Sequence, residues 1–203
     1  LGTGALTWHL AGRPPMPSIR SRLRTSRSML RDPLLFVLGT AIVGTYAYVA
    51  VLGIGTPQND ADALVYHLTR SALWRQHQAI GWLGAVSEPR IDGNPILAEI
   101  AQATAMVLDG SERFVWIGQW GAAVALALST LALGRRLGLA PNEALFGALL
   151  VPLLPIVVVQ SYTAYNDLVV GSFVLCAAAL SLSERRADLV PFAAAIGLAV
   201  ATK

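Results

Sequence analysis

Acidic, aromatic and basic side chains are concentrated in the segment NDADALVYHLTR, which begins at Asn59. Asp62, Tyr66 and Arg70 recur at intervals of four residues, so on a helix they lie on one side. A carboxylate placed in this way can accept the proton of a hydroxyl group during a reaction. A simpler interpretation also stands, because acids are favoured in the first turn of a helix and Asn59 or Asp60 is suited to cap it.

The residue pattern does not predict a metal site or a disulfide. On a straight helix His67 projects about 140° away from Asp62, which disfavours a metal site shared by the two. No other spacing of His, Cys and carboxylates is typical of zinc, so we expect His67 and His77 to be solvated or interfacial. Cys176 is the single cysteine and lies in an apolar run, which predicts a buried free thiol.

A further acid, Asp167, directly precedes the apolar run that begins at Leu168. An acid at the outer end of a membrane span costs a few kcal/mol when it faces lipid, so such acids usually face a cavity or a partner. We therefore expect a functional role for Asp167.

The composition predicts an all-α, polytopic membrane protein. The chain is 55% hydrophobic and 13% charged, whereas about a quarter of the residues in a soluble domain are charged. Five spans are expected, the last of them truncated at the end of the chain: 34–54, 114–133, 144–159 with a polar extension to 165, 168–182 and 189–202. Pro152 and Pro155 should kink the third span.

Arginines predict the orientation of these spans. The basic tail, residues 1–33, and the pairs Arg135/Arg136 and Arg185/Arg186 should be cytoplasmic, and the tail needs only anionic lipid, not nucleic acid, as its partner. Eight of the twelve acids then face outward. Residues 1–15 resemble no signal peptide, and Met16 is a plausible natural start, so we expect residues 1–15 not to be native.

The outer loop, residues 55–112, is too long to be a simple connection. Residues 60–79 and 95–108 are predicted to form two interfacial helices. In the first of them, the apolar side should face the membrane and the side that carries Asp62, Tyr66 and Arg70 should be polar. Three tryptophans are expected to act as interface anchors: Trp74, Trp82 and Trp116.

The order of these motifs resembles the N-terminal part of the GT-C glycosyltransferases. This superfamily includes the protein O-mannosyltransferases and the lipid A aminoarabinose transferases, and the likeness is to its family 39 type. YHLTRSALW resembles the YHLPR-x-x-x-W form of bacterial members and follows a D-x-x-x-Y element, Asp62 to Tyr66. PRIDGNPILAE resembles R-x-x-x-x-P-x-x-x-E, through Arg90, Pro95 and Glu99. SYTAYNDLVVGSFVLCAAAL resembles the element that places an acid, here Asp167, at the mouth of the fourth span.

The final GLAVATK looks like the small-residue helix with a terminal lysine that members carry further along. The sequence departs from many members at Ala63, where they carry a second acid, so a paired-acid site is not implied. The likeness covers only the first part of a full enzyme, so we expect this chain to be a fragment that is inactive alone.

The resemblance implies transfer of a sugar from a polyprenyl phosphate to a hydroxyl of a glycan, lipid or protein acceptor. Such a reaction takes place on the outer face of a bacterial-type plasma membrane. Asp62 is implied as the general base, which predicts inversion at the anomeric carbon. Arg70 or Arg90 would stabilise the leaving phosphate. The remaining substrate-binding candidates are Tyr66, His67, Glu99 and Asp167, and a divalent metal is an open possibility.

Two other classes of protein remain open. A transporter or flippase fragment would use Asp167 and the kinked third span as part of a substrate path. It should concentrate acids near the middle of the membrane, whereas most acids here lie in the outer loop. The other class is a noncatalytic membrane scaffold.

Overall fold

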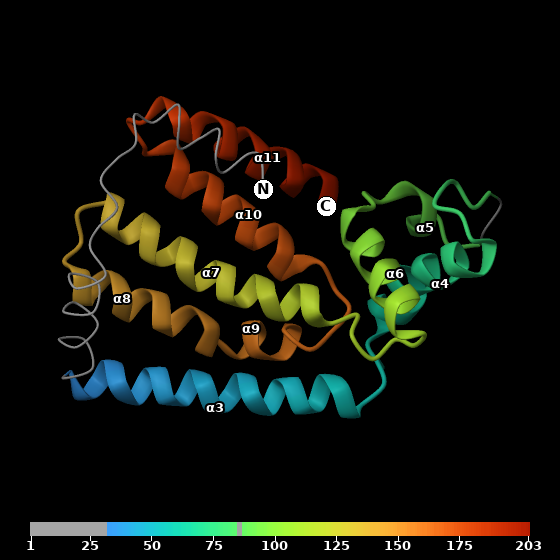
Figure 1. The fold of residues 1–203 in the computed structure, drawn as a ribbon, viewed down its shortest axis with the longest axis horizontal. Coiled ribbons are helices and arrows are strands. Elements are labelled where there is room, and N and C mark those ends of the chain that lie inside the picture. Colours follow the sequence, from blue (N-terminus) through green and yellow to red (C-terminus); the bar gives the residue numbers. More distant parts are fainter. Residues whose placement is uncertain (1–31, 85–86) are drawn as a thin grey trace.

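The computed structural model describes residues 32–84 and 87–203, and this part of the chain is helical without any β-strand. It therefore confirms the predicted all-α fold. Long helices run side by side in one layer, and a smaller group of helices lies at one end of it (Figure 1). The predictions made for residues 1–31, which cover nearly all of the basic tail, fall outside the described residues.

Helix α3 (Pro33–Gly55) starts at a cap that its own sequence provides. Oδ1 of Asp32 accepts hydrogen bonds from the N–H groups of Leu34 (3.0 Å) and Leu35 (3.4 Å), which typically stabilises a helix by about 1 kcal/mol. Pro33 has no N–H to satisfy at this position. The helix has 23 residues, is apolar, and is mostly exposed. It is long enough to cross a membrane, as predicted for residues 34–54.

Helix α7 (Ile117–Arg136) is the second helix of spanning length, with 20 residues. It begins three residues later than predicted, because residues 114–116 form a turn. Arg135 and Arg136 occupy its last turn, where the helix dipole favours positive charge. Within the part of the chain that the structure describes, α3 and α7 are the helices long and apolar enough to span a membrane. The other three predicted spans are shorter helices.

The third predicted span is broken, as its prolines indicate. It consists of α8 (Pro141–Leu150), a single 3-10 turn, η2 (Val151–Leu153), and α9 (Pro155–Gln160). A proline inside a helix removes one hydrogen bond and frees a carbonyl. The hydroxyl of Tyr46 in α3 donates to the carbonyl of Pro152 at 3.0 Å, so a polar group at the break is satisfied by the neighbouring helix.

The fourth and fifth predicted spans are α10 (Asp167–Ser181) and α11 (Leu189–Thr202), with 15 and 14 residues. The turn η3 (Arg186–Asp188) precedes α11. Oε1 of Gln119 in α7 accepts hydrogen bonds from the N–H groups of Leu168 (3.0 Å) and Val169 (3.1 Å). A buried side chain of one helix thus caps the start of the next, which fixes α10 against α7.

The layer has the order α3, α8–α9, α7, α10, α11, since each of these neighbours packs against the next (Figure 1). Cys176 in α10 is a free thiol of intermediate exposure and is not fully buried as predicted. The buried cluster at the centre of the layer consists of Tyr46, Ala122, Ala123, Val157 and Leu168.

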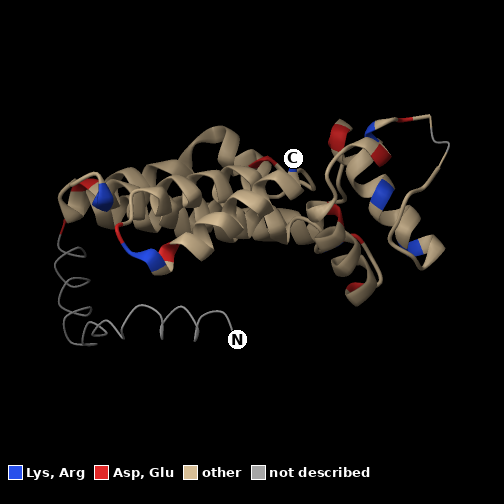
Figure 2. Ribbon diagram, turned by 90° about the horizontal axis from the view of Figure 1, so that it is seen from above, with Lys and Arg blue, Asp and Glu red and all other residues tan. Residues whose placement is uncertain are grey.

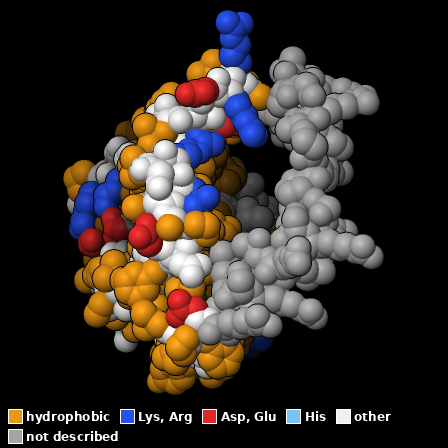
Figure 3. All heavy atoms as spheres, turned by 90° about the vertical axis from the view of Figure 1, so that its left-hand side faces the viewer, with side chains coloured by type: hydrophobic (Ala, Val, Ile, Leu, Met, Phe, Trp, Pro, Cys, Tyr) orange, Lys and Arg blue, Asp and Glu red, His pale blue; other side chains and the backbone are white. Residues whose placement is uncertain are grey.

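Charged residues lie near the two ends of the molecule, and the middle of the helical layer is free of them (Figure 2). Figure 3 looks at the end where α7 turns into α8, and shows charged side chains on that end with hydrophobic side chains around it. Arg136 connects the end of α7 to η3 and to the last turn of α10, because it pairs with Asp188 (3.1 Å) and donates to the carbonyl of Ala179 (2.6 Å). The arginine pairs predicted to share one side therefore lie at one end of the layer.

The smaller group comes from the predicted outer loop and is called the outer group below. It contains the π-helical turn η1 (Ala63–His67), α4 (Leu68–His77), α5 (Arg90–Gly93) and α6 (Leu97–Asp109), and α4 packs against α6. The two helices predicted in this loop are present.

Two of the three tryptophans predicted as interface anchors are instead buried in the protein. Nε1 of Trp74 donates to the carbonyl of Gly81 (2.7 Å), and Nε1 of Trp116 donates to the carbonyl of Arg113 (2.7 Å). Each indole has an internal partner for its N–H, so burial leaves no polar group unsatisfied. Only Trp82 of the three, with 79% of its surface exposed, remains available as an anchor.

Candidate functional site

A single wide turn determines which side chains of the first outer helix face inward. The N–H of Leu68 bonds to the carbonyl of Ala63, five residues earlier, and not to a carbonyl four residues earlier. The extra residue rotates the following turn relative to a regular helix. Tyr66, His67 and Arg70 therefore share the buried face. The prediction of a solvated His67 was wrong, because it assumed a straight helix and the side chain is only 1% exposed.

The predicted polar side of this helix is thus divided, because Tyr66 and Arg70 are buried and Asp62 is exposed. Tyr66 and Arg70 point into the outer group, while Leu64 and Val65 of the predicted apolar face are exposed. Asp62 lies before the wide turn and stays exposed. Asp60 contributes its backbone carbonyl to the first turn, accepting from the N–H of Leu64 at 3.0 Å. No side-chain hydrogen bond of Asn59 or Asp60 caps the helix within the described residues.

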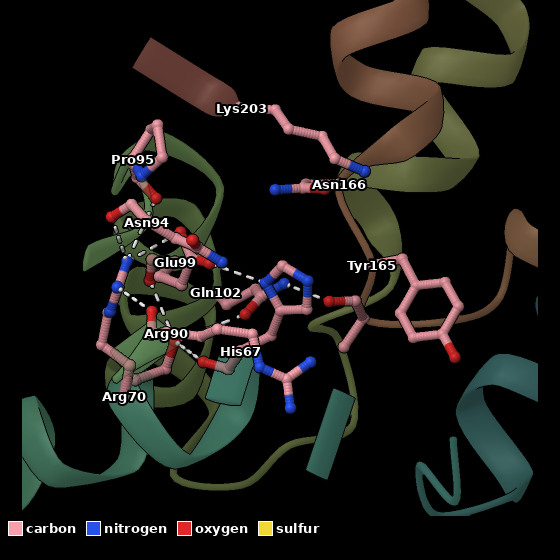
Figure 4. A network of polar contacts seen from close by, with 12 residues as sticks. His67, Arg70, Arg90, Asn94, Pro95, Glu99, Gln102, Tyr165, Asn166 and Lys203 are labelled. Atoms are coloured by element: carbon pink, nitrogen blue, oxygen red, sulfur yellow. Dashed lines mark hydrogen bonds and ion pairs between the residues drawn. The ribbon is translucent and has the colours of Figure 1, made fainter. Parts of the chain in front are cut away.

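Arg70 is a buried structural residue. Its guanidinium donates to three carbonyls, those of Arg90 (2.7 Å), Asn94 (3.0 Å) and Pro95 (3.1 Å), so it holds the turn that contains α5 (Figure 4). The side chain is 1% exposed. Its role as a phosphate ligand, which the resemblance implies, is therefore less well supported than the same role for Arg90.

Glu99 and His67 form a buried pair between α6 and η1. Nδ1 of His67 lies 2.6 Å from Oε1 of Glu99, and the carboxylate is fully buried. An isolated buried carboxylate would cost several kcal/mol. The guanidinium of Arg70, 3.7 Å from Oε2 of Glu99, supplies a compensating charge. The three candidates Glu99, His67 and Arg70 are thus brought together in one cluster.

Two residues that the sequence analysis did not select support this cluster. The hydroxyl of Ser71 donates to the backbone carbonyl of Glu99 (3.1 Å) and contacts Oε1 of Gln102 (3.3 Å). Gln102 in turn donates to the carbonyl of Ala164 at 2.6 Å, which ties the outer group to the segment that leads into α10. A signal existed in the sequence, because Ser71 is four residues after His67 and Gln102 is three residues after Glu99, spacings that put each pair on one helix face.

Asp62 and Arg90 form the exposed part of the site. Nη1 of Arg90 lies 3.0 Å from Oδ1 of Asp62, and its Nε lies 2.8 Å from Oε1 of Glu88. The hydrogen bond to Glu88 raises the pKa of Arg90, and the same contact lowers the pKa of Glu88. Arg90 is therefore charged, and it remains accessible beside Asp62 and Glu88, because 44% of its side chain is exposed.

Tyr66 lies beneath this ion pair. The guanidinium of Arg90 sits 4.7 Å from the centre of the Tyr66 ring, which allows a cation–π interaction. Burial raises the pKa of Tyr66, and the negative charge of Asp62 adds to the effect. Tyr66 thus carries the exposed pair on one side and contacts buried His67 on the other, at 4.0 Å between ring centres.

Asp167 marks the other side of the site, at the start of α10. Gln160 donates to its Oδ2 at 3.1 Å, and the ammonium group of Lys203 forms an ion pair with its Oδ1. The side chain of Asp167 is 38% exposed. Lys203 was noted in the sequence only as part of a helix likeness, and the structure adds it to the residues around the site.

The charges of Asp62 and Asp167 both raise the pKa values of two tyrosines, Tyr66 and Tyr165. Burial is the main cause that raises the pKa of Tyr165, and the carboxylates of Asp60, Asp62 and Asp167 raise it further. Tyr66 is subject to the charges of Asp62 and Asp167 as well. The two acids therefore act on the same pair of rings, although no direct contact joins them.

An apolar cavity of about 470 Å³ adjoins these residues. It lies between α6, α7, α10 and α11, and Tyr165 is part of both its wall and the acid-bearing region. The volume is in the range of small-molecule sites, about 300–1,000 Å³. Apolar side chains make up most of its lining, and the larger ones include Leu97, Phe114, Val115, Val169, Phe173 and Leu198.

The described residues contain no group of three or more His, Cys, Asp or Glu side chains that could hold a metal ion. No known protein family, no curated protein and no solved structure matches this chain.

Proposed function

We propose that this chain belongs to a membrane glycosyltransferase that moves a sugar from a polyprenyl phosphate to an acceptor hydroxyl of a glycan, lipid or protein. In this proposal α3, α7, the broken α8–α9 helix, α10 and α11 are five membrane spans. The N-terminus is cytoplasmic, and the site lies on the extracytoplasmic face of a bacterial-type plasma membrane. One observation carries the proposal: Tyr165 lines an apolar cavity, and the rings of His67 (6.2 Å away) and Tyr66 connect it to the exposed pair of Arg90 and Asp62.

The residues have complementary roles in such a reaction. The apolar cavity suits a hydrocarbon chain, and Arg90 suits the phosphate that leaves with it, because a guanidinium can bind phosphate through two hydrogen bonds. Asp62 is the proposed base. It accepts the proton of the acceptor hydroxyl while the new bond forms at the anomeric carbon and the bond to the phosphate breaks, which inverts that carbon. Asp167 would help to hold the substrates, Glu99 would act on them only through His67, and a divalent metal is an open part of the proposal.

Membranes that contain the complete protein can test this proposal with labelled polyprenyl phosphate sugars. Asp62→Asn should reduce transfer by about 10²- to 10⁴-fold, the usual contribution of a general base. Asp60→Asn is the matched control, because it removes an acid two positions away whose backbone, not its side chain, bonds in the helix. Equal activities of the two variants would remove Asp62 as the base, and no transfer by the unaltered protein from any such donor would remove the function.

The break between α8 and α9 favours a second candidate, a transporter or flippase. Broken helices commonly line substrate paths in transporters, where freed carbonyls bind ions. Here the hydroxyl of Tyr46 already occupies the carbonyl of Pro152. Transport of a labelled polyprenyl lipid across vesicles, unaffected by Asp62→Asn, would favour this candidate over glycosyl transfer.

A further inference from the structure

The buried imidazole of His67 has one nitrogen that is fixed and one that is free. Nδ1 lies 2.6 Å from Oε1 of Glu99, and the hydroxyl of Ser71 lies within hydrogen-bond distance of the backbone carbonyls of both residues. Nε2 has no hydrogen-bond partner within the described ranges. Two other unpartnered atoms of this region, Oε2 of Glu99 and Nε of Arg70, are completely covered, whereas Nε2 is not. The ring is 1% exposed overall, so this free nitrogen lies in an otherwise closed environment.

The neighbours of His67 determine where its proton is. An ionised carboxylate only accepts hydrogen bonds, so Glu99 places the proton on Nδ1 and leaves a lone pair on Nε2. Arg70 already balances the charge of Glu99 from 3.7 Å. A second cation on His67 would be buried without a compensating charge, which is costly.

Nε2 belongs to the same region as the proposed site. The imidazole lies between the ring of Tyr66, at 4.0 Å, and the ring of Tyr165, at 6.2 Å between centres. Figure 4 shows it between the side chains of α6 and the segment that contains Tyr165 and Asn166. Tyr66 is covered by Arg90 on its exposed side, and Tyr165 is part of the wall of the apolar cavity.

We propose that Nε2 of His67 is a fixed hydrogen-bond acceptor that binds a hydroxyl group of the sugar being transferred. The proposal rests on the proposed function and specifies a part of its substrate. A lone pair on Nε2 attracts a hydroxyl donor and repels the oxygens of an ionised phosphate. In the lipid-linked substrate, His67 thus recognises the sugar and Arg90 recognises the phosphate. His67 is a specificity residue in this arrangement, while Glu99 is a positioning residue that acts through it.

The state of the imidazole can be measured without any transfer assay. The chain has three histidines, and in the complete protein, labelled with ¹⁵N-histidine, the His67→Phe variant identifies the signals of His67. At neutral pH we expect a protonated Nδ1 and an unprotonated Nε2. Glu99→Gln should let the proton redistribute between the two nitrogens. A doubly protonated ring, or a proton on Nε2, in the unaltered protein would overturn the proposal and leave the proposed function untouched.

Ligand recognition can then be measured with water-soluble, short-chain prenyl phosphate hexoses and their monodeoxy analogues. A hydroxylated probe should shift the Nε2 signal, and one of the deoxy analogues should not. His67→Phe, which keeps a flat ring, should raise KM for the hydroxylated probe by about 3- to 10-fold, the value of one neutral hydrogen bond, and should reduce discrimination against that analogue.

Asp62→Asn is the matched comparison, since it should lower kcat with the Nε2 signal still responsive. An Nε2 signal that responds to none of the hydroxylated probes, in a protein that transfers sugar, would overturn the inference alone. Absence of transfer from every donor would instead contradict the proposed function.

Discussion

The indole ring of Trp116 lies directly against Gly53, in the last turns of α3. A Cβ atom at Gly53 would approach Cε2 of Trp116 to 2.5 Å, closer than packed atoms can come. The ring cannot easily move away, because its Nε1 donates to the carbonyl of Arg113. This contact joins the end of the first long helix to the turn that precedes α7.

Gly53→Ala should therefore destabilise the protein, by about 1–3 kcal/mol, as expected for overpacking. Gly39→Ala is the control in the same helix, because a Cβ at Gly39 meets nothing within 4 Å. Thermal unfolding of the detergent-solubilised protein measures both. A similar loss of stability in the two variants would show that the backbone of α3, and not the contact with Trp116, is sensitive to alanine.

Arg70→Lys should destabilise the outer group although it keeps the charge. Lysine lacks the planar fork that reaches three carbonyls, and each buried carbonyl left unpaired costs about 1–3 kcal/mol. Arg75→Lys is the control on the same helix, since Arg75 makes a single exposed bond, to the carbonyl of Gly110. Limited proteolysis of residues 60–110 should be faster in the Arg70 variant alone. Equal resistance would contradict the structural role of the three bonds.

Two replacements of Gln119 should show whether the stability of the protein depends on the hydrogen-bond acceptor at this position. Gln119→Leu leaves the N–H groups of Leu168 and Val169 without their acceptor, at a cost of about 1–3 kcal/mol for each buried group. Gln119→Glu retains an acceptor, and its negative charge suits the start of α10. We expect a lower unfolding temperature for the leucine variant than for the glutamate variant. The reverse order would show that the cap contributes little.

Tyr66 should make the protein sensitive to alkali. Burial raises its pKa above the ordinary value of 10.0, so the unfolded chain gives up this proton before the folded chain does. The contribution of Tyr66 to stability is present below pH 10 and is lost as the pH rises through the folded pKa. Tyr66→Phe should therefore lose less stability between pH 9 and pH 11 than the unaltered protein. Parallel curves for the two proteins would exclude this linkage.

Local sequence patterns predicted much of the helical layer. The run of apolar residues after Asp32 and Pro33 determines α3, and the bounds of α11 coincide with the predicted segment. Pro152 and Pro155 correctly indicated the break in the third segment. These features depend on backbone geometry and composition within a few residues, and both are visible in the sequence.

The candidate site was predicted only in part, because its geometry depends on distant contacts. The resemblance brought Asp62, Arg90 and Glu99 together as candidates, and the structure places them in one region. The burial of His67 and Arg70 was not predictable from a projection at 100° per residue, since a wide turn changes the angle between them and Asp62. The partners of Arg70 are backbone carbonyls 20 to 25 residues away, and backbone carbonyls have no sequence signature.

The short segment before α10 is bonded to three separate parts of the chain, through the side chains of Gln58 and Gln102 and through its own Asn166. Its carbonyls accept from Gln58, at Tyr162 (3.0 Å), and from Gln102, at Ala164 (2.6 Å), while Asn166 donates to the carbonyl of Thr202 (2.9 Å). Helix α6 cannot move away from this segment without breaking the buried bond of Gln102. The amides of the outer group and of the end of the bundle should therefore exchange with deuterium as one cooperative unit, although the chain connects them through turns.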